Sequence, residues 1–119
     1  VLRRIGEIGR EYGLRVGNVF HAGDGNMHPL ILFDANKPGD LERCEEMGAE
    51  ILRLCVQVGG CLTGEHGVGI EKRDLMFDQY TSTDIDAQLN VKDVFDPKWL
   101  LNAAKVFPLS ATETRRAAS

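Results

Sequence analysis

Apolar side chains recur at helical spacing in two long segments of the chain. In the first segment they are Leu2, Ile5, Ile8 and Tyr12, and in the second they are Leu41, Cys44, Ile51, Cys55 and Val58. Side chains three or four positions apart lie on one face of an α-helix. We therefore predict helices over residues 1–13 and 41–58. Gly13 is the expected C-cap of the first helix, and Asp40 is the expected N-cap of the second.

Between these helices the pattern changes to two β-rich runs. Residues 16–22 (VGNVFHA) and 28–34 (HPLILFD) flank a glycine-rich segment, which predicts a β-hairpin. The pair Asp24-Gly25 favours a two-residue type I′ turn, because both central positions of that turn need positive φ. In that register His21 pairs directly with His28 on one face of the hairpin. Their Cβ atoms would then lie about 4.5–5.5 Å apart.

The pattern of the C-terminal half predicts several shorter elements. We predict a short strand at 61–64, helices over 70–80 and 83–95, and a disordered tail over 109–119, where apolar residues are almost absent. The expected fold class is α+β, with a small, mainly antiparallel sheet, helices packed on one of its faces and ferredoxin-like character. Residues 1–108 would form one domain.

Composition narrows the classes of function. The 119 residues are 43% hydrophobic and 27% charged, and no apolar run approaches the roughly 20 residues of a membrane span. A net charge of −4 argues against a nucleic-acid partner. Cys44, Cys55 and Cys61 contain no C-x-x-C pair, which argues against a disulfide framework and favours a reducing cytoplasmic compartment. Because Val1 is not an initiator methionine, we expect one piece of a longer protein.

All three histidines lie in two glycine-rich motifs. His21 and His28 flank the GDGN segment, and His66 follows Glu65 in GEHGVG. Two converging imidazoles can bind zinc, manganese or iron, and a carboxylate can complete the set of ligands. Alternatively, the two histidines are a cross-strand pair without a metal, and the glycines only shape turns. Asn26 either donates to a ligand or caps the turn.

The two motifs together carry a family resemblance. HAGDGNMHPLI followed by GGCLTGEHGVGIEKRD resembles the C-terminal part of FAD-linked oxidases of the vanillyl-alcohol oxidase type, over about residues 1–108. Within that family, the two motifs resemble those of the group that contains the bacterial glycolate oxidase D subunit and the D-lactate dehydrogenases. The resemblance implies that a small 2-hydroxy acid, glycolate or D-lactate, is oxidised to the 2-oxo acid by hydride transfer to FAD.

The resemblance also implies roles for individual residues. His21, His28 and Glu65 are similar to ligands of a divalent metal, usually zinc, that binds the substrate. His66 is similar to the base that takes the hydroxyl proton. Asn26 is assigned to substrate binding, and the positions similar to cofactor-binding residues are Gly67, Asn102 and Lys105. The family's LNPGK appears here as LNAAK, with Ala103 and Ala104 in place of Pro-Gly.

Substrate size, partners and location are implied in the same way. Leu30 stands two places after the second histidine, where relatives specific for dicarboxylates carry a polar residue, so a small monocarboxylate is favoured. The family's flavin-binding domain lies N-terminal to this region, so the isolated chain is expected to be inactive. Further expectations are other oxidase subunits, including an iron–sulfur electron-transfer subunit, a homo-oligomer, and a cytoplasmic location with peripheral attachment at the inner face of the membrane.

Two other classes of function remain open. One is a non-catalytic α+β binding or oligomerisation module, in which the hairpin motif serves only turn geometry. The other is a stand-alone metallohydrolase in which Glu65 activates water, although the sequence lacks the H-E-x-x-H spacing of zincins.

Overall fold

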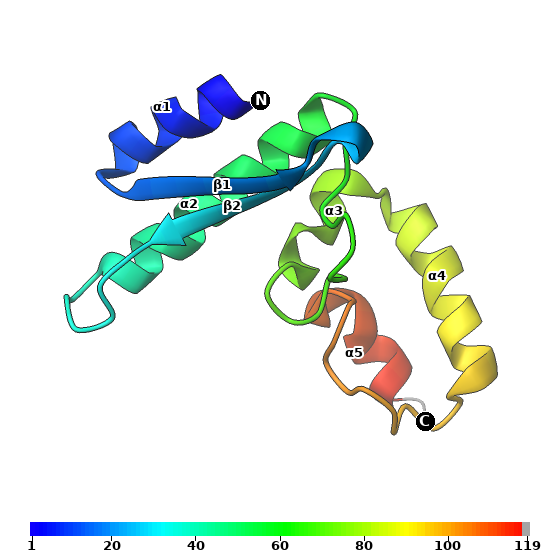
Figure 1. The fold of residues 1–119 in the computed structure, drawn as a ribbon. Coiled ribbons are helices and arrows are strands. Elements are labelled where there is room, and N and C mark those ends of the chain that lie inside the picture. Colours follow the sequence, from blue (N-terminus) through cyan, green and yellow to red (C-terminus); the bar gives the residue numbers. More distant parts are fainter. Residues whose placement is uncertain (118–119) are drawn as a thin grey trace. The chain divides into compact units, whose positions relative to one another are not determined.

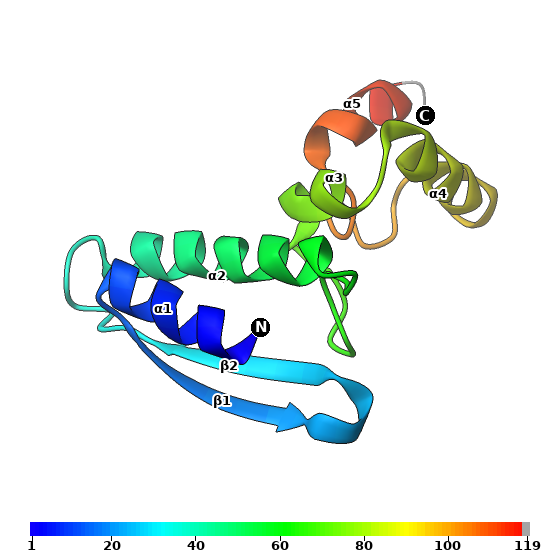
Figure 2. The same cartoon turned by 90° about the horizontal axis from the view of Figure 1, so that it is seen from above.

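The computed structural model describes residues 1–117, which divide into two compact units, residues 1–64 and a second unit that begins at Glu65. The first unit contains α1 (Leu2–Tyr12), β1 (Arg15–His21), a 3₁₀ turn at Ala22–Asp24, β2 (Asn26–Leu32) and α2 (Asp40–Gln57) (Figure 1). Within the described residues, β1 and β2 form one antiparallel two-stranded sheet. Figure 2 shows α1 and α2 on the same side of this hairpin. The predicted α+β class, with a small antiparallel sheet, is confirmed.

The core of the first unit lies between the two helices and one face of the hairpin. Its most deeply buried side chains, each at most 2% exposed, are Ile5, Ile8, Met47 and Ile51. Val16, Met27 and Ile31 of the strands pack against them. Because side chains alternate across a strand, the residues between these three point to the opposite face of the sheet. That outer face carries Arg15, Gly17, Val19 and His21 of β1, and Asn26, His28, Leu30 and Leu32 of β2.

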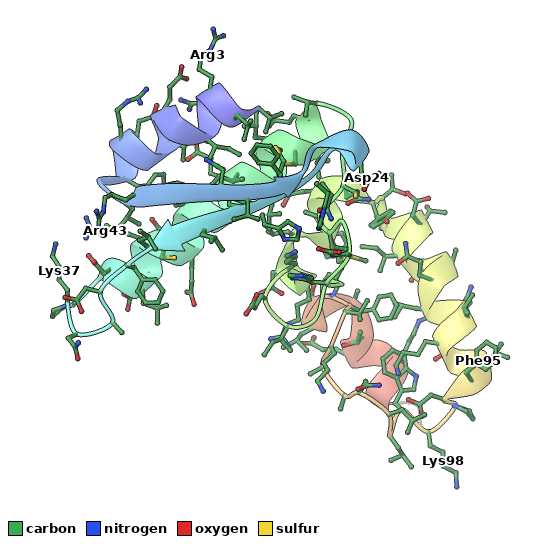
Figure 3. The ribbon with its side chains drawn as sticks, in the orientation of Figure 1. Arg3, Asp24, Lys37, Arg43, Phe95 and Lys98 are labelled. Carbon is green, nitrogen blue, oxygen red and sulfur yellow. The ribbon has the colours of Figure 1, made fainter. Side chains whose placement is uncertain are left out.

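The predicted helix ends hold for α1 and shift by one residue for α2. Gly13 is the C-cap of α1, with a φ of 68°. At α2 the N-cap is Gly39, and Asp40 is the first helical residue, which corrects the predicted cap. The Asp40 carboxylate accepts a hydrogen bond from the Asp34 N–H (3.2 Å) and pairs with Arg43, labelled in Figure 3. These contacts lower the pKa of Asp40, the Asp34 hydrogen bond most strongly, although burial opposes them.

The second unit is helical where it is regular. It contains a 3₁₀ turn at Arg73–Leu75, α3 (Met76–Gln79), α4 (Ser82–Phe95) and α5 (Leu109–Ala117). The predicted helix over 83–95 is confirmed as α4, which begins with a capping box between Thr81 and Asp84. The helix predicted over 70–80 is shorter than expected, because residues 70–72 precede the first helical turn.

Two further predictions need correction. Residues 61–64 contain no strand, and the Cys61 thiol instead donates to the carbonyl oxygen of Thr63, 3.1 Å away, within the same short loop. Residues 109–117 form α5 rather than a disordered tail, and residues 118–119 of that predicted tail lie outside the described residues. Polar contacts anchor α5, because Arg115 donates to Asn90 Oδ1 (2.9 Å) and pairs with Asp86 and Asp93.

Candidate functional site

The turn of the hairpin is longer than the sequence predicted. His21 pairs with Asn26, and Val19 pairs with His28, so the two histidines are not directly opposite each other. Four residues, 22–25, connect the strands, and Asp24, labelled in Figure 3, ends the 3₁₀ turn within this connection. Gly25 has a φ of 67°, whereas Asp24 is not among the residues with positive φ. A type I′ turn needs positive φ at both positions, which is why the predicted register was wrong.

The two histidines nevertheless converge on the outer face of the hairpin. They occupy diagonal rather than opposite positions, a spacing that long and aromatic side chains can still bridge. Their ring centroids are 5.5 Å apart, and the ring planes meet at 82°. His21 is exposed, and His28 is half-buried. The register thus differs from the prediction, but the proximity of the two imidazoles does not.

Asn26 lies against the loop that follows α2. A Cβ atom placed on Gly64 would come within 2.7 Å of Asn26 Cγ and 3.3 Å of Asn26 Nδ2, with Oδ1 nearer still. Cβ contacts below 3.0 Å are essentially never seen, so a side chain at position 64 would force the Asn26 side chain to move. Sequence reasoning singled out Asn26 but missed its contact with Gly64. The only signal of this contact in the sequence is that Asn26 belongs to one histidine motif and Gly64 to the other.

Glu65 and His66 open the second unit, directly after Gly64. Glu65 Oε1 lies 3.7 Å from His66 Nε2, and the side chains are 46% and 74% exposed, respectively. Gly67 follows with a φ of 85°, and Gly69 has a φ of 56°. Glycine adopts positive φ of this kind without the steric cost that a side chain brings, so these two glycines favour the shape of the loop.

Asn102 and Lys105, the predicted cofactor-binding residues, lie in an irregular segment tied to this loop. The Val106 N–H donates to the carbonyl oxygen of Gly69 over 2.7 Å, and the Arg73 guanidinium donates to the carbonyl oxygen of Ala104. Ala104, which stands where the resembling family has glycine, has a φ of 60°. Ala104 therefore adopts a left-handed backbone conformation, which costs more free energy for alanine than it would for glycine.

Cys44 and Cys55 are poor candidates for metal ligands. Burial raises the pKa of the Cys55 thiol, with a smaller contribution from the neighbouring Cys61, and burial also raises the pKa of Cys44. A raised pKa keeps these two thiols protonated at neutral pH, whereas metals bind thiolates. The nitrogen and oxygen donors of the two histidine motifs are therefore the better ligands.

Comparison with known proteins places the chain in a family. Residues 1–106 match the family described as FAD linked oxidases, C-terminal domain. The chain is 56% identical over 108 residues to the glycolate oxidase subunit GlcD of Escherichia coli (strain K12), a match that covers 91% of this chain and 22% of that protein. It is 36% identical over 111 residues to the subunit of the same name of Bacillus subtilis, covering 93% of this chain and 24% of that protein.

A third relative is named for a different activity. The mitochondrial D-lactate dehydrogenase (cytochrome) 1 of Saccharomyces cerevisiae is 34% identical over 95 residues, covering 80% of this chain and 16% of that protein. The chain thus spans about a fifth of the length of these relatives. The family resemblance predicted from HAGDGNMH and GEHG is confirmed, and the chain belongs to the FAD-linked oxidase C-terminal domain family.

Proposed function

We propose that this chain is the substrate- and metal-binding part of an FAD-dependent oxidoreductase that oxidises a small 2-hydroxy acid, glycolate or D-lactate, to the 2-oxo acid. The observation that carries the proposal is the convergence of His21 and His28 on the outer face of the hairpin. It is supported by the activities for which the relatives are named, glycolate oxidase and D-lactate dehydrogenase.

The residues present fit a borderline divalent cation. His21, His28 and Glu65 each offer one ligand atom, which gives two imidazole nitrogens and one carboxylate oxygen. This donor set suits zinc, manganese or iron, and zinc is the candidate that the family resemblance favours. When bound, such an ion would supply a Lewis acid that grips the substrate and favours loss of its hydroxyl proton.

Glu65 joins this set through the chain itself. It is bonded to Gly64, and Gly64 lies against Asn26, the residue that pairs with His21 in the hairpin. Glu65 therefore follows directly after a residue that lies against the histidine face of the hairpin. This short covalent path is what supports Glu65 as the third ligand.

His66 is the proposed proton acceptor. Oxidation of the hydroxy acid removes a hydride from the α-carbon and a proton from the hydroxyl oxygen. The proton passes to a ring nitrogen of His66, because a neutral imidazole accepts a proton at neutral pH. The exposure of this side chain leaves it able to return the proton to water. FAD, when bound, supplies the acceptor of the hydride.

Several finer assignments remain proposals of the same kind. Asn26 is a candidate contact to the substrate, and the cofactor contacts are proposed at Gly67, Asn102 and Lys105. The Val106–Gly69 hydrogen bond supports the last group, because it joins the segment of Asn102 and Lys105 to the loop of Gly67.

The proposed substrate is a small monocarboxylate. Leu30 lies two residues after His28 on the same strand and therefore on the same outer face, where it is half exposed. An aliphatic side chain there offers no partner for a second carboxylate. Glycolate and D-lactate fit this surrounding better than a dicarboxylate.

Partners and location are also proposals. Two of the relatives are named as subunits, which supports the proposal that the protein works with other oxidase subunits. We further propose that an iron–sulfur electron-transfer subunit is one of them and that the protein forms homo-oligomers. We propose a cytoplasmic location with peripheral attachment at the inner face of the membrane. Among the described residues, no helix has the length and apolar character needed to cross a bilayer.

One observation favours the alternative of a non-catalytic assembly module. Val19, Leu30 and Leu32 are each more than half exposed on the same outer face as the histidines. Such a face can associate with another apolar surface. This alternative predicts a stable oligomer and no stoichiometric metal.

A segment exchange tests the proposed function. Residues 1–108 would replace the matching segment of the E. coli GlcD protein, and the assembled oxidase would be assayed with glycolate and D-lactate. We expect activity with the unchanged segment and at least a 100-fold loss in kcat with His66→Ala, within the range for a lost general base. An inactive exchange that folds and binds FAD, or full activity of His66→Ala, would contradict the proposal.

A further inference from the structure

We propose that Asn26 is a positioning residue, whose side chain holds the backbone at Gly64 and thereby places Glu65 for metal binding. The inference rests on the proposed function, since it concerns how the third ligand reaches the two histidines. It gives Asn26 a role that differs from contact with the substrate.

Asn26 lies at the end of the hairpin, beside the histidines. It is the first residue of β2 and pairs with His21, the last residue of β1, so both side chains project from the outer face at the end of the hairpin. The strand pairing and the core behind it therefore determine where the Asn26 side chain lies. A residue so placed is a rigid support for a neighbouring loop.

The loop at Gly64 lies close to the Asn26 side chain. Three side-chain atoms of Asn26 are the nearest heavy atoms to the position of a Cβ on Gly64. Gly64 is not among the glycines with positive φ, so its backbone conformation does not require glycine. The absence of a side chain at position 64 is thus explained by the Asn26 side chain rather than by backbone shape.

The contact between Asn26 and Gly64 bears on the position of Glu65. Residues 61–64 have no helix or strand to fix them, and Glu65 is the next residue along the chain. Packing of Asn26 on Gly64 constrains the residue that directly precedes Glu65. Groups that orient a metal ligand without touching the metal typically contribute about 10- to 100-fold in metal affinity.

A size exchange tests this arrangement in the full 119-residue chain. The affinity for Zn²⁺ would be measured by competition with a colorimetric chelator, for wild type, Asn26→Ala, Gly64→Ala and the double variant. Circular dichroism would establish at each step that the protein measured is folded. Gly23→Ala is the matched control, because Gly23 lies in the same motif, does not have positive φ and has no atom within 4 Å of an added Cβ.

The expected result is a pattern of non-additive losses. Asn26→Ala should weaken Zn²⁺ binding by about 10- to 100-fold, and Gly64→Ala should weaken it at least as much, because the new methyl group collides with Asn26. In the Asn26→Ala background, Gly64→Ala should cost less than about 3-fold, since the colliding atoms are gone. Gly23→Ala should bind as wild type does.

The outcomes separate this inference from the proposed function. If wild type binds Zn²⁺ but Asn26→Ala binds equally well, or if Gly64→Ala costs the same in both backgrounds, the positioning role is wrong and the metal site stands. If Gly64→Ala does not fold, the comparison of Asn26→Ala with the double variant still decides, because a large further loss in the double variant would overturn the inference. Wild type without Zn²⁺ binding would overturn the proposed function and this inference with it.

Discussion

The two histidine motifs are held in different ways. HAGDGNMH lies at the end of a hairpin whose strands pair from Arg15↔Leu32 to His21↔Asn26, in front of a core of aliphatic side chains. GEHG lies in a loop without regular structure, where the Val106–Gly69 hydrogen bond and two glycines with positive φ shape the chain. The first motif thus depends on packing and strand pairing, and the second on a few polar bonds. Changes to the core and to those bonds should therefore affect the two motifs separately.

The largest expected effect comes from the core behind the first motif. Ile51→Ala removes a side chain that is 2% exposed between α2 and the other core elements, so it should lower the free energy of unfolding by about 2–5 kcal/mol. Urea denaturation followed by circular dichroism measures this loss. Ile70→Ala is the matched control just after the second motif, because Ile70 is 58% exposed and its truncation should change little. Equal losses in both variants would contradict the contrast between the motifs.

The second motif should instead respond to the loss of a polar tether. Arg73→Ala removes the hydrogen bond to the carbonyl oxygen of Ala104, so the segment around Asn102 and Lys105 should open more readily, by about 1.5–3 kcal/mol. Hydrogen exchange of the backbone amides of residues 99–106 measures this opening, with exchange in β1 and β2 unchanged. Lys98→Ala, an exposed position labelled in Figure 3, is the control. Faster exchange in the strands of the Arg73 variant would show that the units are not independent.

A smaller effect of opposite sign is expected at Ala104. Because its φ is 60°, Ala104→Gly should stabilise the second unit by about 1 kcal/mol through relief of the left-handed conformation. The measurement is the change in amide exchange or in the urea midpoint. Ala103→Gly is the matched control, since Ala103 is not among the residues with positive φ and should gain nothing. A destabilised Ala104→Gly variant would show that the methyl group makes a contact that outweighs the strain.

The smallest effect expected is a pH dependence within the second unit. Burial tends to raise the pKa of Asp96, but hydrogen bonds from Lys92 and from the Leu101 and Leu100 N–H groups lower it further than burial raises it, to a value below the usual 3.8. A lowered folded-state pKa gives stability that is present above the unfolded value and is lost as pH falls through the folded value. Stability should therefore fall as the pH decreases below about 4.

Two variants isolate this contribution. In Asp96→Asn the dependence of the urea midpoint on acid pH should flatten, because the position no longer titrates. Asp74→Asn serves as control, since the Asp74 side chain is 79% exposed. Equal acid sensitivity of wild type and Asp96→Asn would mean that other carboxylates, such as Asp40 and Asp84, whose pKa values are also lowered, carry the effect.

The sequence predicted the parts of the fold that apolar periodicity controls. Gly13 ends α1 as expected, and α2 and α4 lie within one residue of their predicted starts, because helix spacing and caps are local signals. The prediction of a disordered tail was wrong because Arg115 is anchored to polar and acidic residues of α4. This contact joins segments that are far apart in sequence. Apolar periodicity therefore predicts helices and their ends, but it does not predict contacts between segments that are far apart in sequence.

The candidate site shows the same limit at the level of single residues. The identity of His21, His28 and Glu65 as candidate ligands came from their chemistry and the family motifs. The pairing of His21 with Asn26 did not, because the choice between a two-residue and a four-residue connection depends on the conformation of Asp24, which the Asp-Gly pair does not determine. The contact of Asn26 with Gly64 joins residues 38 positions apart and leaves no periodic signal.

The central claim is that the two motifs share one metal ion, and metal content tests it most directly. The full chain would be loaded with Zn²⁺, dialysed and measured by plasma mass spectrometry as wild type, His28→Ala and His66→Ala. We predict about one metal per chain in wild type and in His66→Ala, and almost none in His28→Ala, because the proposal assigns His28 as a metal ligand and His66 as the base. Wild type without metal, or a His28→Ala variant that retains as much metal as wild type, would contradict the account.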